Sequence, residues 1–241
     1  MTASVIVPTY NERENLEPLI RTITGLDLPN LSIVIVDDNS PDGTGQLADQ
    51  WASQDQRVRV VHRPGKLGLG TAYIAGFYES LAHGDDLILT MDADFSHNPH
   101  YIPAIMEAAK DYDLVIGSRY VPGGGTRSWG LERRLLSFGA NTFTRLMLGL
   151  TVHDCTSGFR CYHRRVLESL ALDRIFSNGY SFLIEILYKC VSQGWRVGEV
   201  PIIFEDRQRG RSKISQWEIA RALYTVLRLS KDRFLRRGQS S

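Results

Sequence analysis

Two acidic residues, Asp92 and Asp94, stand one position apart directly after the apolar run 87–91. The run predicts a short buried strand, so both carboxylates would lie at the C-terminal edge of a sheet, where open α/β sheets bind ligands. In an extended chain their side chains share a face, so both could reach one ion. Oxygen ligands suit Mg²⁺ or Mn²⁺. Asp-x-Asp alone is a weak motif, because aspartate is also common in turns.

Two further predicted strands end in polar residues that could meet the same ligand. Residues 4–9 are followed by Tyr10 and Glu12, and residues 31–36 lead into Asp38. The C-terminal ends of parallel strands lie along one edge of a sheet, so these side chains can converge there. Asp38 and Glu12 could accept hydrogen bonds from a base or a ribose, and Tyr10 could stack on a ring.

The glycine-rich segment 65–70 does not follow the first strand as a dinucleotide-binding Gly-x-Gly-x-x-Gly would. The chain also lacks the Gly-x-x-x-x-Gly-Lys-[Ser/Thr] sequence of a phosphate-binding loop. We therefore interpret the segment as a flexible turn at the start of a helix, near the place where a nucleotide would bind.

The first half of the chain alternates strands with helices, which predicts an α/β fold with a mostly parallel central sheet flanked by helices on both faces. Asn11 is the expected N-cap of the first helix. The predicted strands are residues 4–9, 31–36, 57–62, 87–91 and 112–117, and the helices are 12–23, 45–54, 70–82 and 101–110.

The alternation ends after residue 119. Residues 121–129 contain three successive glycines, and a loop of this length predicts a functional lid or a mobile segment. Asp154 and Arg160 are expected to pair and brace the irregular loop between them. Beyond these features the sequence predicts helices at 133–150, 180–191 and 214–235 and a strand at 196–204.

The helices at 133–150 and 214–235 have apolar faces with basic edges. This pattern is typical of helices that lie on anionic lipid, although such faces more commonly pack on protein. We expect no signal peptide, and no run of about 18 apolar residues could span a bilayer. Three cysteines without a Cys-x-x-Cys pair argue against a disulfide framework or a zinc site.

Charge is distributed unevenly along the chain. Residues 1–114 contain 7 Lys/Arg and 17 Asp/Glu, a net charge of −10, whereas residues 115–241 contain 21 and 10, a net charge of +11. The basic half is expected to face an anion: phosphates, nucleic acid or an acidic membrane.

Several motifs carry a resemblance to a known family. Residues 6–12 (Ile-Val-Pro-Thr-Tyr-Asn-Glu), 36–44, 65–72 and 91–97 (Met-Asp-Ala-Asp-Phe-Ser-His) resemble family 2 glycosyltransferases of GT-A, Rossmann-like fold. Four later stretches resemble the dolichyl- or polyprenyl-phosphate mannose synthases of that family: residues 117–121, the glycine loop that follows them, 129–141 and 156–160. The resemblance covers nearly the whole chain.

The resemblance implies transfer of mannose from GDP-mannose to dolichyl or polyprenyl phosphate, with inversion and with Mg²⁺ or Mn²⁺. We expect one domain, because the sequence has no repeat and no convincing linker. Residues 1–119 would form the nucleotide-sugar half, 120–213 the acceptor half and 214–241 a C-terminal amphipathic helix. The enzyme would work peripherally at the cytoplasmic face of a membrane, alone or with a small membrane-anchoring partner subunit.

The resemblance also assigns roles to individual positions. Metal binding would fall to Asp92, Asp94 and Ser96; some relatives have Gln in place of Ser96, so a water would complete the shell here. Catalysis would rest on Asp92, Asp94, Arg119, Arg133 and Ser137, of which the last three would grip the acceptor phosphate. The nucleotide sugar would contact Pro8, Tyr10, Glu12, Asp38, Asp92, Ala93, Asp94, Arg119, Arg207 and Lys213.

This reaction agrees with the residues available. A lipid phosphate is anionic near neutral pH, so it needs no general base, and arginines can hold it through bidentate hydrogen bonds. The basic half is then explained without nucleic acid. UDP-glucose is the alternative donor. Two other classes of protein are alternatives. A nucleotidyltransferase would need a basic glycine-rich loop after the first strand. A nucleic-acid-binding module would show steeply salt-dependent binding.

Overall fold

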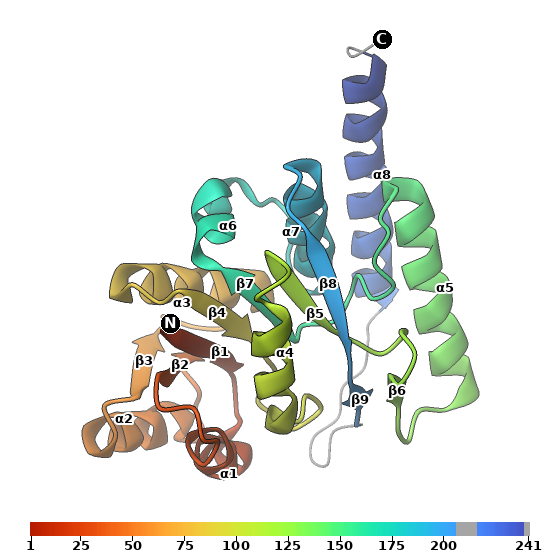
Figure 1. The fold of residues 1–241 in the computed structure, drawn as a ribbon. Helices are drawn as coiled ribbons and strands as arrows, with labels where there is room; N and C mark the ends of the chain where they lie inside the picture. Colours follow the sequence, from red (N-terminus) through yellow and green to blue (C-terminus); the bar gives the residue numbers. More distant parts are fainter. Residues whose placement is uncertain (206–215, 239–241) are drawn as a thin grey trace.

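The computed structural model describes residues 1–205 and 216–238. A seven-stranded sheet lies between two layers of helices (Figure 1). The sheet strands are β1 (Ala3–Thr9), β2 (Leu31–Asp37), β3 (Val58–His62), β4 (Leu87–Thr90), β5 (Leu114–Ser118), β7 (Arg160–His163) and β8 (Val197–Pro201). A separate two-stranded ribbon joins β6 (Gly125–Thr126) to β9 (Ile203–Phe204).

The sheet order is β3-β2-β1-β4-β7-β5-β8. Every neighbouring pair is parallel except those that involve β7, which runs antiparallel to β4 and β5. The predicted mostly parallel sheet is therefore confirmed. β7 was not predicted, because a four-residue strand after an irregular loop is too short to show a period.

Helices cover both faces of the sheet. α1 (Arg13–Thr24), α2 (Thr44–Gln54) and α4 (Ile102–Ala108), with the short 3-10 turn η1 (Pro99–Tyr101) before α4, pack on one face. α3 (Leu69–His83), α6 (Arg164–Ser169) and α7 (Tyr180–Ser192) pack on the other. The strands are apolar on both sides for this reason: in β1, Val5 and Val7 join the first core and Ile6 joins the second.

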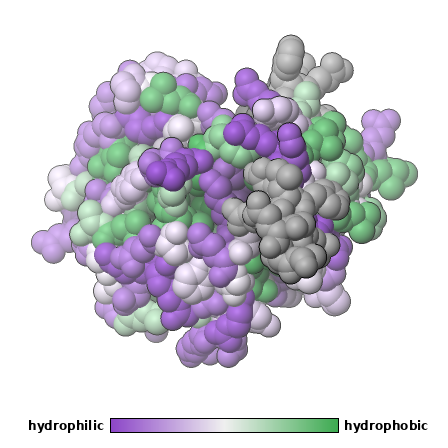
Figure 2. All heavy atoms as spheres, turned by 90° about the horizontal axis from the view of Figure 1, so that it is seen from above, coloured by the Kyte–Doolittle hydropathy of each residue, from purple (hydrophilic) through white to green (hydrophobic). Residues whose placement is uncertain are grey.

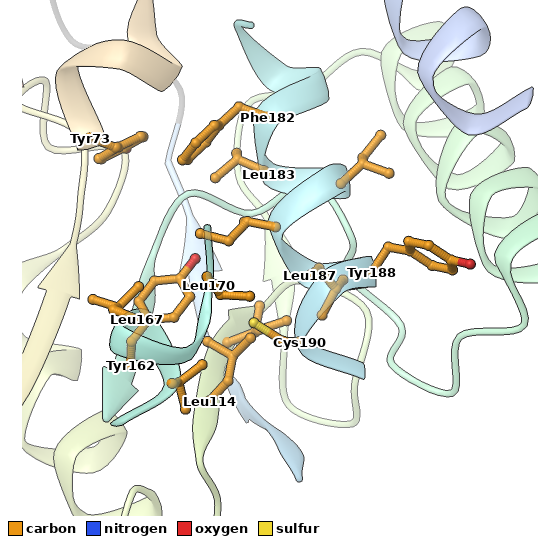
Figure 3. Close-up of a cluster of buried hydrophobic side chains, with 14 of the residues drawn as sticks. Tyr73, Leu114, Tyr162, Leu167, Leu170, Phe182, Leu183, Leu187, Tyr188 and Cys190 are labelled. Atoms are coloured by element: carbon orange, nitrogen blue, oxygen red, sulfur yellow. The ribbon is translucent and has the colours of Figure 1, made fainter. Parts of the chain in front are cut away.

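The core under α7 reaches the pocket described below. In Figure 3, Leu187 and Cys190 of α7 lie over Leu114 of the sheet, while Phe182 faces Tyr73 of α3. The rings of Phe182 and Tyr73 are stacked, with centroids 6.0 Å apart. This packing fixes the start of α7 against α3.

Two helices lie outside these layers. α5 (Leu131–Leu148) and α8 (Gln216–Gly238) pack against each other, and α8 also packs on α7. Figure 1 shows α8 extending well past the rest of the fold. None of the described helices combines the length and the hydropathy needed to cross a bilayer.

Several features of the structure differ from the sequence predictions. The cap position of α1 is Glu12, and Asn11 instead has a left-handed backbone with φ of 60°. The single strand expected at 196–204 is two strands, because β8 pairs with β5 whereas β9 pairs with β6. The basic loop 206–213 lies outside the described residues. The short elements α6 and η2 (Leu172–Arg174) were also not predicted.

Candidate active site

A pocket runs from the C-terminal ends of β4 and β5 to a groove between α5, α7 and α8. Its lining combines one acid, two arginines and several hydroxyls with apolar side chains. The polar lining includes Asp92, His97, Arg119, Arg133, Ser137, Asn141 and Thr156, and the apolar lining includes Leu136, Phe143, Leu183, Ile184, Leu223 and Val226.

The two acids of the Asp-x-Asp motif are presented differently. The Asp92 side chain is 27% exposed, lines the pocket and accepts a hydrogen bond from the Tyr73 hydroxyl (3.3 Å). Asp94 is buried and outside the pocket lining, and its Oδ1 accepts from the N–H (3.0 Å) and hydroxyl (2.6 Å) of Ser96. Ala93 between them is buried. Asp92 is thus the acid that a ligand in the pocket meets.

His97 supports Asp92 from within the fold. Its Nδ1 accepts a hydrogen bond from the Asp92 backbone N–H (3.1 Å), so the ring proton belongs on Nε2. Burial lowers the pKa of His97, although the charges of Asp92 and Asp94 oppose the shift. The cap of η1 is Asn98, whose side chain accepts from the His100 N–H.

Left-handed backbone conformations gather at the same sheet edge. Asn11, Asn39 and Phe95 follow β1, β2 and β4, and all three have φ near 60°. Asparagine tolerates this region, whereas a bulky residue such as Phe95 does so at a cost. Strained backbone of this kind is typical of ligand-binding sites, and here it bends the chain sharply after each strand.

The predicted base-reading residues lie around the segment 65–70. The Lys66 ammonium lies 4.4 Å from the centre of the Tyr10 ring. Asp38 hydrogen-bonds the Leu67 backbone and forms a buried ion pair with Arg63 (2.6 Å). Burial raises the pKa of Asp38, and the Arg63 guanidinium only partly offsets this. Tyr10 and Asp38 are thus brought together by one loop.

The other donor-side residues surround this loop less closely. Pro8 is half-buried near the end of β1. Glu12 is half-buried and accepts a hydrogen bond from Asn15 (2.7 Å). At Gly68 a side chain would collide with Asn178, and φ is +104°, so glycine is required there. Sequence reasoning assigned no role to Arg63 or Lys66; both follow the third strand in the basic stretch beside the glycines.

Arg119 pairs with Asp154, not with an exposed anion. Its Nε and Nη2 each lie 2.7 Å from a different Asp154 oxygen, and Nη2 also donates to Thr156 (2.8 Å). Burial opposes both charges, yet the pairing outweighs it: the pKa of Arg119 is raised and that of Asp154 is lowered. Arg119 lines the pocket while this bidentate pair fixes its position.

The expected pair of Asp154 with Arg160 is therefore wrong. Arg160 is fully buried, and its guanidinium donates to the backbone carbonyls of Cys155, Ser157 and Leu183. The loop between Asp154 and Arg160 is still braced, but each residue binds different partners. The predicted partners, Asp154 and Arg160, are only six positions apart. The observed partner, Arg119, lies 35 positions from Asp154, and the sequence did not indicate it.

The other two predicted acceptor residues line the pocket beside Arg119. The guanidinium of Arg133 lies 4.1 Å from the centre of the Trp129 ring. The Ser137 hydroxyl accepts a hydrogen bond from the Tyr120 hydroxyl (2.7 Å). The structure thus brings together Arg119, which follows β5, with Arg133 and Ser137 of α5.

Asn141 ties α5 to the loop before β7. Its Oδ1 accepts from the Cys155 N–H (2.8 Å), and its Nδ2 donates to the Ser137 carbonyl (3.0 Å). Asn141 is buried and lines the pocket. The motif 129–141 contained it, but only the structure shows its partners.

Two predicted phosphate-binding residues, Arg207 and Lys213, lie outside the described residues. Within residues 1–205 and 216–238, no cluster of three or more His, Cys, Asp or Glu side chains could hold a metal ion by itself. Any ion bound at Asp92 would therefore need further oxygen atoms from a bound substrate or from water.

The chain is similar to a known family over most of its length. Residues 4–171 match glycosyl transferase family 2. A polyprenol monophosphomannose synthase of Mycolicibacterium smegmatis is 48% identical over 92% of this chain and 84% of its own length. An undecaprenyl-phosphate mannosyltransferase of Micrococcus luteus is 43% identical over 95% of this chain and 93% of its own.

Solved structures with low sequence identity have the same fold. Glucosyl-3-phosphoglycerate synthase of Mycobacterium tuberculosis, in complex with Mn²⁺, UDP-glucose and phosphoglyceric acid, superposes with a TM-score of 0.71. The identity is 22%, over 95% of this chain and 80% of that one. The complex of that enzyme with Mg²⁺ and UDP gives a TM-score of 0.68 at 20% identity, over 95% and 79% of the two chains. The expected GT-A type of fold is confirmed.

Proposed function

The chain belongs to glycosyl transferase family 2, and from this we propose that it transfers mannose from GDP-mannose to a polyprenyl or dolichyl phosphate. The observation that carries the proposal is the mixed lining of the pocket. Arg119, Arg133 and Asp92 line it together with apolar side chains of α5, α7 and α8. An anionic head on a hydrocarbon chain matches both kinds of lining. The two curated relatives are named for mannosyl transfer to such lipids.

The acceptor phosphate would bind at Arg119, Arg133 and Ser137. Guanidinium groups suit phosphate oxygens: Arg133 would bind the phosphate together with Nη1 of Arg119, because Asp154 and Thr156 occupy the Nε and Nη2 of Arg119. The first isoprene units would then lie between α5, α7 and α8, against Phe143 and Val226. Burial of this hydrocarbon adds affinity that a free phosphate cannot gain.

The lipid phosphate would itself be the nucleophile. One of its oxygens attacks C1 of mannose while the bond between C1 and the GDP oxygen breaks, and GDP leaves with the electron pair. A phosphomonoester is mostly ionised at neutral pH, so no proton has to be removed first. His97 is therefore not needed as a base, and its Nδ1 is already occupied by the Asp92 backbone. A single displacement inverts the configuration at C1.

The donor set fits Mg²⁺ or Mn²⁺ shared between the protein and a diphosphate. Mg²⁺ in such sites keeps several waters and takes one or two carboxylates together with substrate phosphates, and Asp92 offers an accessible carboxylate. Asp94 and Ser96, which follow Asp92 in the chain and hydrogen-bond to each other, would complete the protein's share. When bound, the ion would stabilise the leaving diphosphate as a Lewis acid. Arg207 and Lys213 would add positive charge to the same phosphates.

The nucleoside would bind where the segment 65–70 meets Tyr10 and Asp38. Asp38 and Glu12 supply carboxylates for N–H and O–H donors of guanosine, with Pro8 beside them. Lys66 now lies over the Tyr10 ring and would have to make room for a stacked base. These contacts do not distinguish guanine from uracil, so UDP-glucose is the second donor to be tested.

The enzyme would work peripherally at the cytoplasmic face of a membrane, with or without a small anchoring subunit. Large apolar side chains are exposed along α5: Leu131, Leu135, Leu136, Phe138 and Leu146. Figure 2 shows hydrophobic residues gathered along the right side of the molecule, where α5 lies in Figure 1. An apolar helix face beside the groove would let a lipid enter directly from the bilayer.

The test offers purified protein undecaprenyl phosphate in detergent with Mg²⁺ or Mn²⁺ and labelled donor. We expect label from GDP-mannose, and not from UDP-glucose, in the lipid phase. Asp92→Asn should reduce the rate at least a hundredfold, whereas Asp49→Asn, an exposed acid on α2, should leave it unchanged. Labelling from UDP-glucose alone would change the donor, and no lipid product from either would refute the proposal.

A further inference from the structure

The indole ring of Trp129 contacts both arginines that line the pocket. Its centre is 4.1 Å from the guanidinium carbon of Arg133 and 5.5 Å from that of Arg119. The ring also packs edge-on against Phe204, with centroids 5.4 Å apart. Trp129 is 8% exposed and lines the pocket. An aromatic face attracts both cations, so the indole holds two like charges at one site.

The Nε1–H of this indole is buried and has no hydrogen-bond acceptor among residues 1–205 and 216–238. A buried indole N–H normally has a partner, because an unsatisfied donor loses its hydration without compensation. The other buried donors in this condition, the Nε atoms of Arg59 and Arg145, do not line the pocket. Of these three buried donors, the Trp129 N–H is the one that belongs to a pocket-lining residue. It therefore indicates a ligand that supplies a hydrogen-bond acceptor.

We propose that Trp129 is an acceptor-binding residue, whose Nε1–H donates a hydrogen bond to a phosphate oxygen of the lipid. This inference rests on the proposed function, because it takes the anion at Arg119 and Arg133 to be an isoprenyl phosphate. The indole then has two tasks. Its face holds Arg133 in place, and its N–H fixes one phosphate oxygen, so that a different oxygen points at the sugar.

Steady-state kinetics separate the two substrates. Trp129→Phe keeps an aromatic face and removes the N–H. We expect the KM for undecaprenyl phosphate to rise about tenfold, as for loss of one hydrogen bond to a charged group, and the KM for GDP-mannose to change less than twofold. The matched control is Trp195→Phe, whose Nε1–H bonds to Ser169 and Gln193 (3.1 Å each) away from the pocket. An unchanged KM for the lipid in Trp129→Phe would overturn the proposal.

A binding measurement on the wild-type chain does not depend on turnover. The four tryptophans give four indole N–H signals in a ¹⁵N-correlated NMR spectrum, which the single Phe variants assign. Farnesyl phosphate should move the Trp129 signal downfield in a saturable way, and farnesol should not. If other signals report saturable binding while the Trp129 signal stays in place, the inference is wrong but the proposed function stands. If the wild type neither binds farnesyl phosphate nor transfers mannose, both fall.

Discussion

At the scale of single residues, the site depends on charges that are satisfied inside the protein. Asp154 is fully buried and gives both carboxylate oxygens to Arg119. It also accepts hydrogen bonds from the backbone N–H groups of Arg119 and Ser157. A buried ion pair is stable only when its hydrogen bonds are complete, and removal of one partner leaves a charge without compensation. Arg119 is therefore a pocket residue whose position Asp154 determines.

We expect Asp154→Asn to destabilise the fold by about 3–5 kcal/mol, since Arg119 would stay buried without its anion. Urea unfolding followed by circular dichroism measures this change. The control is Glu17→Gln, which breaks the exposed pair with Arg21 on α1 and should cost less than about 1 kcal/mol. Equal effects of the two substitutions would mean that the Arg119–Asp154 pair does not anchor the site.

The three cysteines give a test of packing that is sensitive to pH. Burial raises the pKa of Cys155 and of Cys190 to about 12, and Cys161 shifts in the same direction. Only thiolates react with disulfide reagents, so no thiol should be labelled in the folded protein at pH 8, and three should be labelled in urea. The raised pKa also means that these thiols stabilise the fold up to about pH 9, and that this contribution is lost as pH rises toward 12. Fast labelling of the native protein would contradict the core as described.

At the scale of elements, periodicity identified the strands and helices that are long and regular. β1, β2 and β4 were predicted because each is a short run of mostly apolar residues that ends at polar ones. β7 and the division of β8 from β9 could not be predicted, because each depends on which distant strand is the partner. The site followed the same rule: local motifs located Asp92 and Arg133, whereas the partners of Arg119 and Asn141 are set by tertiary contacts.

The exposed face of α5 makes a prediction about membranes. Leu135 and Leu146 are 63% and 75% exposed and do not line the pocket. We expect Leu135→Gln combined with Leu146→Gln to weaken sedimentation with vesicles of anionic lipid about tenfold, since each leucine would bury apolar surface in the bilayer. Tyr78→Ser removes a similarly exposed side chain from α3 and should have no effect. Unchanged vesicle binding of the α5 variant would exclude this face as the contact.

At the scale of the whole molecule, the uneven charge along the sequence corresponds to the two halves of the site. The acidic half contributes β1 to β4, with the Asp-x-Asp motif and the loop at Tyr10 and Asp38. The basic half contributes Arg119, Arg133 and the outer helices. The charge pattern predicted an anionic ligand from sequence alone, but it could not predict that an apolar groove would continue from the arginines. That groove required the packing of α5, α7 and α8.

The most direct test of the central claim is the structure of the lipid product. GDP-mannose labelled with ¹³C at C1 would be incubated with undecaprenyl phosphate, and the anomeric carbon of the extracted lipid would be examined by NMR. Coupling of C1 to phosphorus, with the configuration inverted to β, is the predicted result. Retention of the α configuration, or a mannose C1 without coupling to phosphorus, would contradict direct attack by the lipid phosphate.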